Sequence, residues 1–168
     1  MRKIGLLSDN HSYYGEEIYQ NLLDVDEIWH SGDIGNIKSI EKIKEIGVFR
    51  AVYGNIDDIS VKEYYSLNNI FFCEGVKVLM THIGGYPGRY SPRVKDLLRL
   101  ERPNLYICGH SHICKVVKDK EFNILHMNPG SYGHYGFHKI RTLLKFEIDE
   151  RKIVNLRVVE LGLRGQIK

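Results

Sequence analysis

The stretch KIGLLSDNH, residues 3–11, opens the chain and passes from apolar to polar within one short segment. Its first part, residues 3–8, is mostly apolar with little alternation, which predicts a strand buried on both faces of a sheet. Residues 16–23 then fit a helix, and residues 26–31 form a second strand-like run. The chain therefore begins with a strand, a helix and a strand.

An isoleucine stripe extends this pattern into a second helix. The stripe consists of Ile37, Ile40, Ile43 and Ile46. Its spacing is helical, Gly47 suits the C-terminal cap, and residues 48–53 follow as a third predicted strand. Strands that alternate with helices in this way are expected to be parallel, with right-handed crossovers between them.

The second half of the chain contains mostly strand-like runs. The predicted strands are residues 64–73, 76–81, 105–108, 113–117, 122–126, 142–148 and 154–160. One helix is expected at residues 91–100, begun by Ser91-Pro92 and ended before Pro103. We therefore expect an α/β fold with two packed sheets, partly parallel and partly antiparallel, and helices outside them. The length of 168 residues suits a single domain over residues 1–168.

Composition narrows the class of function. The chain is 43% hydrophobic and 27% charged, with a formal net charge of +3. This mild positive charge is compatible with a small anionic substrate and argues against extended nucleic-acid binding. No apolar run approaches the ~20 residues of a membrane span. Three cysteines without a C-x-x-C pair, and no export signal at the start, predict free thiols in a reducing cytoplasm.

Polar residues follow the predicted strands at the points where they end. They are Asp9, His11, Asp33, Asn55, His82, His110 and His112. In a parallel sheet the carboxyl ends of the strands meet at one edge, which is where such folds bind ligands. Residues far apart in the sequence are thereby expected to come together in one site.

The chemistry of this set indicates divalent metal ions. Carboxylate, amide oxygen and imidazole without thiolate suit Mn²⁺, Fe²⁺, Zn²⁺, Co²⁺ or Ni²⁺ better than Ca²⁺. Seven side chains are too many for one such ion, whereas two ions about 3.5–4 Å apart with one bridging carboxylate would use them well. Such a pair lowers the pKa of a bound water towards about 7 and so supplies a hydroxide nucleophile for attack on a phosphate.

Each block taken alone also has an ordinary structural interpretation. D-x-H is a weak motif, Gly-Asp and Gly-Asn are common turn dipeptides, and a lone histidine is more often packed or exposed than ligating. The joint occurrence of these blocks, each at the end of a strand, favours the metal site.

The blocks resemble those of the calcineurin-like metallophosphoesterases. The resemblance rests on Asp9-x-His11, Gly32-Asp33, Gly54-Asn55, His82 and Gly109-His110-Ser111-His112 and covers residues 4 to about 148. Length and order are similar to the small bacterial YfcE-type phosphodiesterases, and Asn128-Pro129-Gly130-Ser131 is similar to a block common among them. The resemblance implies a four-layer α/β/β/α sandwich of two mixed sheets.

The resemblance also implies roles for individual residues. One ion would be held by Asp9, His11, Asp33 and His112, and the other by Asp33, Asn55, His82 and His110. Asp33 would bridge the two ions, and Asp33, Asn55 and His82 would be the catalytic residues. The two divalent ions are expected to be Mn²⁺ first, with Ni²⁺, Zn²⁺, Fe²⁺ or Co²⁺ as alternatives.

Several functions fit this resemblance. The first is hydrolysis of small phosphodiesters by attack of a metal-bound hydroxide, and hydrolysis of phosphomonoesters is its nearest variant. A second is a catalytically weak metal-binding scaffold for protein partners, like the retromer subunit of the same fold. A nuclease acting on polymers is a third, disfavoured by the nearly neutral charge. Eleven tyrosines leave an interface with a second copy of the chain open.

One block departs from the larger members of the family. They carry a histidine after the asparagine of this block to protonate the leaving group, where this chain has Ile56, followed by Asp57. Ile56 cannot donate a proton, which favours good leaving groups. His134 and His138 are candidates for another donor or for substrate contacts. Asn10 and Arg89 are further candidates for substrate contacts. Arg89 belongs to the glycine-rich loop at residues 84–90, which is either a pocket wall or an ordinary connection.

Overall fold

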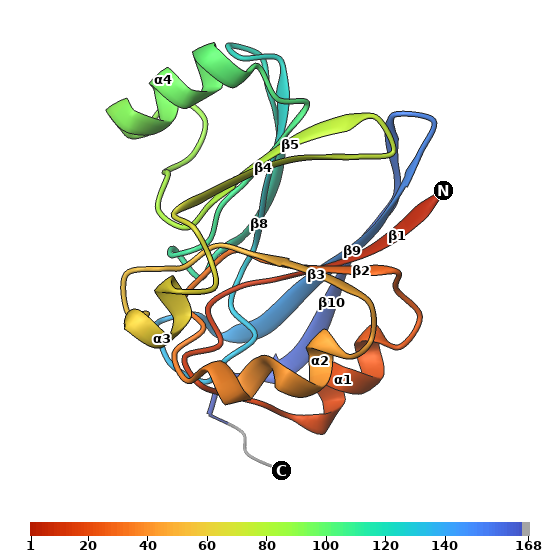
Figure 1. Cartoon of the computed structure of the whole chain (residues 1–168), viewed down its shortest axis with the longest axis vertical. Coiled ribbons are helices and arrows are strands. Elements are labelled where there is room, and N and C mark those ends of the chain that lie inside the picture. Colours follow the sequence, from red (N-terminus) through yellow and green to blue (C-terminus); the bar gives the residue numbers. More distant parts are fainter. Residues whose placement is uncertain (166–168) are drawn as a thin grey trace.

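Two five-stranded sheets lie face to face between helices, as Figure 1 shows. This computed structural model describes residues 1–165. Helices α1 (Glu16–Leu22) and α2 (Glu41–Lys44) cover the outer face of one sheet, and α4 (Pro92–Glu101) covers the other. The α/β/β/α sandwich expected from the sequence is confirmed.

Sheet A contains the first three strands of the chain. Its order is β10-β9-β1-β2-β3, with β1 at Arg2–Leu7, β2 at Glu27–His30, β3 at Val48–Ala51, β9 at Ile140–Asp149 and β10 at Lys152–Leu163. β1, β2 and β3 are parallel, whereas β9 and β10 are antiparallel to their neighbours. The carboxyl ends of the first three strands therefore meet at one edge.

Sheet B is likewise mixed. Its order is β4-β5-β6-β8-β7, with β4 at Asn68–Cys73, β5 at Val76–Thr81, β6 at Leu105–Ile107, β7 at Cys114–Asp119 and β8 at Ile124–Pro129. β5, β6 and β8 are parallel, and β4 and β7 pair antiparallel at the two edges. The polar loops after β5, β6 and β8 thus also lie at a common edge.

The main apolar core lies between the two sheets. Trp29 of sheet A is fully buried there, with Phe71 and Phe146 packed edge-on against its ring. Separate apolar clusters lie between sheet A and its helices and between sheet B and α4. Burial on both faces explains why the strands of the first half are nearly continuous apolar runs.

Two elements differ from their sequence-based prediction. The isoleucine stripe forms a 3-10 turn, η1 (Ile37–Ile40), followed by the short helix α2, instead of one helix. The strand expected from residue 64 begins only at Asn68, and the helix α3 (Ile59–Lys62) precedes it. Asp58 caps α3 by accepting a hydrogen bond from the Ser60 N–H, a local interaction that an apolar pattern does not reveal.

The described residues also bear on the predictions from composition. Among residues 1–165 we find no helix with the length and apolar character that crossing a membrane would need. Cys73, Cys108 and Cys114 are free thiols, as expected.

Candidate metal centre

Six of the predicted ligands form two tight groups at the edge where the strands of both sheets end. The first group is Asp9, His11 and His112, and the second group is Asp33, His82 and His110. Within each group, one ligand atom from every residue lies within 4.8 Å of the others. Each group combines one carboxylate from sheet A with imidazoles, at least one of them from a sheet B loop.

Backbone hydrogen bonds join the two loops that carry the carboxylates. Beyond the ends of β1 and β2, the Asp9 N–H donates to the carbonyl of Gly32, at 3.0 Å. The His11 N–H donates in the same way to the carbonyl of Asp33, at 3.1 Å. The pairing of the parallel strands therefore continues into the loops and fixes the distance between the two carboxylates.

Most of the predicted ligands have strained backbone. Five of the seven lie in the left-handed region, which residues other than glycine rarely adopt. They are Asp9 (φ 58), His11 (φ 47), Asp33 (φ 56), His110 (φ 69) and His112 (φ 57). Strain of this kind persists only where the surrounding structure enforces it, and it concentrates at functional sites. All five of these residues belong to the two groups of candidate ligands.

Two glycines of the motifs are required by close packing against the carboxylates. A methyl group at Gly54 would overlap Oδ1 of Asp33, and one at Gly109 would overlap the Ser8 hydroxyl. Neither glycine has a positive φ. They are needed because the backbone passes directly over the acidic side chains.

The carboxylate of Asp33 faces both groups. Its Oδ1 lies 3.2 Å from Nε2 of His82, and its Oδ2 lies 3.7 Å from Nε2 of His11. Burial alone would raise the pKa of Asp33, but His82 and a hydrogen bond from the Ile56 N–H outweigh it and lower the pKa. Asp33 is therefore ionised at neutral pH, with one oxygen towards each group.

Asp9 is fully buried and holds the imidazole loop in place. It accepts hydrogen bonds from the Ser8 hydroxyl and from the backbone N–H of His110, the latter at 3.1 Å. Its Oδ1 also lies 3.2 Å from Nε2 of His112. The carboxylate of Asp9 thus anchors the loop after β6 and also faces the imidazole of His112.

The hydrogen bond of His82 leaves its Nε2 facing the site. Its Nδ1 lies 2.8 Å from the carbonyl of Ser31, which can only accept, so Nδ1 carries the proton. Burial alone would lower the pKa of His82, but the carboxylates of Asp33 and Asp9 raise it above the ordinary value. Within residues 1–165, the buried Nε2 makes no hydrogen bond although it faces this negative charge. A cation at this point would satisfy the nitrogen and both carboxylates.

The remaining imidazoles are also arranged as ligands. The Nε2 atoms of His11 and His112 lie 3.3 Å apart and point to a common position. Burial lowers the pKa of His11 and of His110, so both are neutral at pH 7, the form that binds metals. Close imidazole nitrogens beside carboxylates fit divalent ions of the kind predicted from the sequence.

Asn55 lies in the loop after β3, beside the carboxylate of the second group. The residues on either side of it, Gly54 and Ile56, both contact Asp33. The Asn55 side chain itself is exposed.

Asp57 and His30 accept hydrogen bonds from the backbone of the loops after β2 and β3. Asp57 is buried and accepts hydrogen bonds from the N–H groups of Gly35 and Gly54, at 2.6 and 2.7 Å. The sequence had left Asp57 without a partner, whereas the structure shows that it joins the loops after β2 and β3. His30 accepts a hydrogen bond from the Gly32 N–H, and burial lowers its pKa to about 3.

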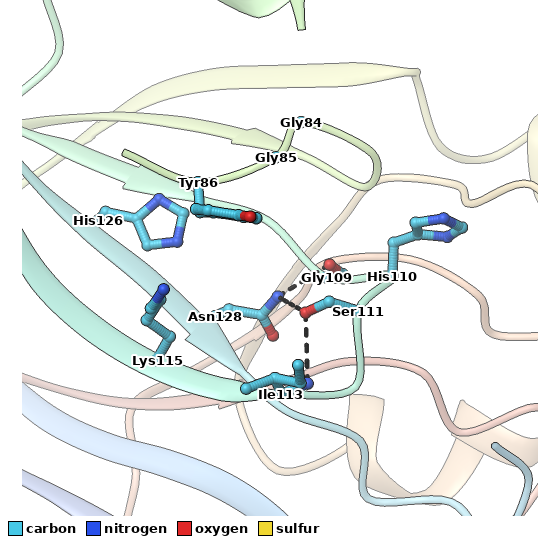
Figure 2. Close-up of a pocket in the computed structure, with 10 residues that line it drawn as sticks. All are labelled: Gly84, Gly85, Tyr86, Gly109, His110, Ser111, Ile113, Lys115, His126 and Asn128. Carbon is cyan, nitrogen blue, oxygen red and sulfur yellow. Dashed lines mark hydrogen bonds between the residues drawn. The ribbon is translucent and has the colours of Figure 1, made fainter. Parts of the chain in front are cut away.

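The Asn128-Pro129-Gly130-Ser131 block connects sheet B to the site. Asn128 donates to the carbonyl of Gly109, at 2.8 Å, and to the Ser111 hydroxyl, at 3.1 Å, which fixes the loop between the two histidines (Figure 2). Ser131 donates to the carbonyl of Asp9, at 2.7 Å. The block therefore orients ligands of both groups without itself facing an ion.

The four predicted substrate contacts have different surroundings. Asn10 is fully buried, and its amide nitrogen donates to the Tyr13 carbonyl and the Ser39 hydroxyl, which does not support a substrate contact. Arg89 is exposed on the loop at residues 84–90.

The two histidines of the loop after β8 also differ. His134 packs on the ring of Tyr13, whereas the ring of His138 lies 5.3 Å from that of His112. The Nε2 of His138 donates to the Gly133 carbonyl, and burial lowers its pKa. Tyr135, which the sequence did not single out, stacks against His11 with ring centroids 4.9 Å apart.

A cavity of about 460 Å³ opens beside His110 (Figure 2). Residues lining it include Tyr86, Ile113, Lys115, His126 and Asn128. The loop at residues 84–90 therefore contributes a wall to a pocket, which is the first of the two interpretations that the sequence allowed. Lys115 and His126 belong to no motif and lie within β7 and β8, so no sequence signal distinguishes them.

The sequence of this chain is similar to those of known phosphoesterases. The profile of the calcineurin-like phosphoesterase superfamily domain matches residues 2–151. A probable metallophosphoesterase of Methanocaldococcus jannaschii is 28% identical over 136 residues, which are 76% of this chain and 67% of that protein.

Solved structures share the fold at low sequence identity. Zinc-bound Vps29 of Entamoeba histolytica has a TM-score of 0.75 at 14% identity, covering 94% of this chain and 98% of that one. An archaeal phosphodiesterase has a TM-score of 0.71 at 20% identity, covering 95% and 99%. Because the profile of the superfamily domain matches most of the sequence, the chain belongs to the calcineurin-like phosphoesterase superfamily.

Proposed function

We propose that this protein hydrolyses small phosphodiesters, using two divalent metal ions held between the ends of its sheets. The observation that carries the proposal is the position of Asp33, whose two carboxylate oxygens face imidazoles of different groups. A carboxylate placed in this way is suited to bridge two ions. When bound, such a pair activates a water molecule as nucleophile and offsets the charge that develops on the phosphate.

We assign ligand roles to the side chains accordingly. Asp9, His11, Asp33 and His112 would hold one ion, and Asp33, Asn55, His82 and His110 the other. The chain's own contribution is a set of carboxylates and imidazoles that the strained loops hold before any substrate arrives. Such preorganisation removes the cost of rearranging charges during the reaction.

The surroundings of the site favour diesters with good leaving groups. The cavity beside His110 offers room for a second ester group, which a monoester lacks. Ile56 has no proton to give, and the Nε2 proton of His138 is already donated to the Gly133 carbonyl. A leaving group that is stable as an anion therefore needs less help than an ordinary alkoxide.

The test is an assay of protein stripped of metal and reloaded with Mn²⁺ or Ni²⁺. We expect faster hydrolysis of bis-p-nitrophenyl phosphate than of p-nitrophenyl phosphate, and loss of at least about 10²-fold in Asp33→Ala. Asp96→Ala is the matched control, because Asp96 is an exposed carboxylate on α4. Full activity in Asp33→Ala would refute the bridging role. Two bound ions without hydrolysis under any metal would instead favour a scaffold.

A further inference from the structure

The cavity beside His110 lies between the loop at residues 84–90 and strands β7 and β8 of sheet B (Figure 2). His110 belongs both to the second group of candidate ligands and to the lining of this cavity. For a ligand whose phosphate sits at the metal centre, the space that adjoins His110 is therefore this cavity. Its volume of about 460 Å³ is within the ordinary range for small-molecule sites.

Tyr86 forms one wall of the cavity and is held there by its loop. The Cys108 thiol donates to the carbonyl of Gly85 at 3.5 Å, and the Arg89 N–H donates to the carbonyl of Tyr86 at 2.7 Å. Tyr86 as a whole residue is 41% exposed. The loop backbone is held on both sides of Tyr86, and the ring lines the cavity.

A cation already lies on that aromatic face. The Nζ of Lys115 is 4.6 Å from the centroid of the Tyr86 ring. Lys115 is an exposed residue, and its ammonium can be exchanged for another group that suits the face of a phenol. A flat aromatic ring is such a group, and the displaced ammonium would then meet polar atoms at the edge of that ring.

The inner end of the cavity carries a neutral imidazole. His126 is buried, and burial together with the charge of Lys115 lowers its pKa to about 4. Its Nδ1 lies 3.4 Å from the Tyr90 hydroxyl, so Nε2 is left to interact with a ligand. Asn128, by contrast, already uses its amide nitrogen on the Gly109 carbonyl and its Oδ1 on the Gly130 N–H.

We propose that this cavity binds the aromatic ester group of the substrate, of the size and polarity of a nucleobase. The ring would stack on Tyr86, with Ile113 on the apolar side and with Lys115 and His126 at its polar edge. The inference rests on the proposed phosphodiesterase function, because the phosphate at the metal centre directs the aromatic group into the cavity. Bases commonly stack on aromatic side chains in this way.

Binding to Mn²⁺-loaded protein by isothermal titration calorimetry tests the proposal with two probes, AMP and ribose 5-phosphate. Both carry the same phosphate on the same sugar, so the contribution of the metal centre cancels in the ratio of their dissociation constants. We expect AMP to bind about tenfold more tightly to the wild type. Tyr86→Ala should lower this preference below about threefold, whereas Tyr86→Phe should keep it because stacking does not need the hydroxyl.

Tyr135→Ala is the matched control, since Tyr135 is also an exposed aromatic residue beside the candidate ligands but stacks on His11, away from the cavity. The preference for AMP should persist in this variant. Equal binding of the two probes to the wild type, no measurable binding of AMP, or a preference lost in Tyr135→Ala and kept in Tyr86→Ala would each overturn the proposal.

The diesterase assay on the same preparations separates this inference from the proposed function. Hydrolysis that depends on Asp33, combined with equal binding of the two probes, would overturn the cavity assignment alone. A preference for AMP that depends on Tyr86, without hydrolysis under any metal, would support the cavity as an aromatic site and refute the phosphodiesterase.

Discussion

The oxygen ligands of the proposed metal centre come from sheet A, whereas all but one of its imidazoles come from sheet B. On sheet A the loops after β1, β2 and β3 are joined by backbone hydrogen bonds and by the buried carboxylate of Asp57. On sheet B, His82 is held through the carbonyl of Ser31, and the Gly109–His112 loop is held by Asn128 and Asp9.

The two sheets therefore contribute differently to the proposed metal centre. The sheet A half places two buried carboxylates, Asp9 and Asp33, on loops that backbone hydrogen bonds join. The sheet B half depends on sheet A for part of its anchoring, and its His110 is exposed at the edge of the cavity. We therefore expect changes in sheet A to disturb the whole centre, and changes in sheet B to have smaller and more local effects.

Asp9→Asn should have the largest effect, because Asp9 both faces His112 and holds the backbone of His110. We expect diesterase activity to fall about 10²- to 10³-fold, since the negative charge is lost although the shape is kept. For His110→Gln, on the sheet B side, we expect a decrease in diesterase activity that is at least about tenfold smaller than the decrease in Asp9→Asn. Steady-state rates with saturating Mn²⁺ measure both, and equal losses would remove the proposed asymmetry.

Acid should destabilise the sheet B half through His126. In the folded protein its pKa is about 4, whereas the unfolded chain binds the proton near pH 6.5. As the pH falls, the unfolded state therefore binds the proton first. The free energy of unfolding decreases between pH 6.5 and pH 4, by about 3 kcal/mol at pH 4. His126→Gln should flatten this part of the profile in urea unfolding at several pH values. An unchanged slope would show that His126 is not the group responsible.

Asp57→Ala should be the most destabilising change among the anchors of sheet A. It leaves the buried N–H of Gly54 and the partly buried N–H of Gly35 without this partner, at a cost of about 2–3 kcal/mol. Thermal unfolding followed by circular dichroism should show a midpoint about 5–10 °C lower. Asp58→Ala is the control, because that exposed residue only caps α3 and should cost about 1 kcal/mol. Equal shifts would mean that the loops do not depend on Asp57.

Asn128→Ala should have the smallest effect, on the sheet B side. Without its hydrogen bonds to Gly109 and Ser111, the loop of His110 and His112 is less well oriented, and Mn²⁺ affinity should fall about tenfold. Calorimetric titration of stripped protein with Mn²⁺ measures this change. Asn69→Ala, which removes one long hydrogen bond in β4, should leave the affinity unchanged. A loss as large as in Asp9→Asn would contradict the proposed difference between the halves.

Much of the fold was predictable because its signals are local. The buried strands of sheet A appear as apolar runs, and the residues that follow them converge because parallel strands end at one edge. The exceptions are also local. Asp58 caps α3 ahead of β4, and the isoleucine stripe forms η1 and α2 instead of one helix.

The site was predictable only in part, for a related reason. The motifs identified the seven candidate ligands, but the residues that position them act through contacts between distant segments. Asp57 is recognisable only once Gly35 and Gly54 are neighbours, and His126 only once the cavity exists. Asn10 illustrates the opposite case, since its place beside Asp9 suggested a substrate contact while its side chain is buried between loops.

The central claim is that Asp33 bridges two ions between the sheets. A crystal structure of Mn²⁺-loaded protein, with anomalous differences measured at the manganese edge, tests it most directly. We predict two anomalous peaks about 3.5–4 Å apart, one beside Asp9 and one beside His82, with the carboxylate of Asp33 in contact with both. A single peak, or two peaks that Asp33 does not join, would contradict this account.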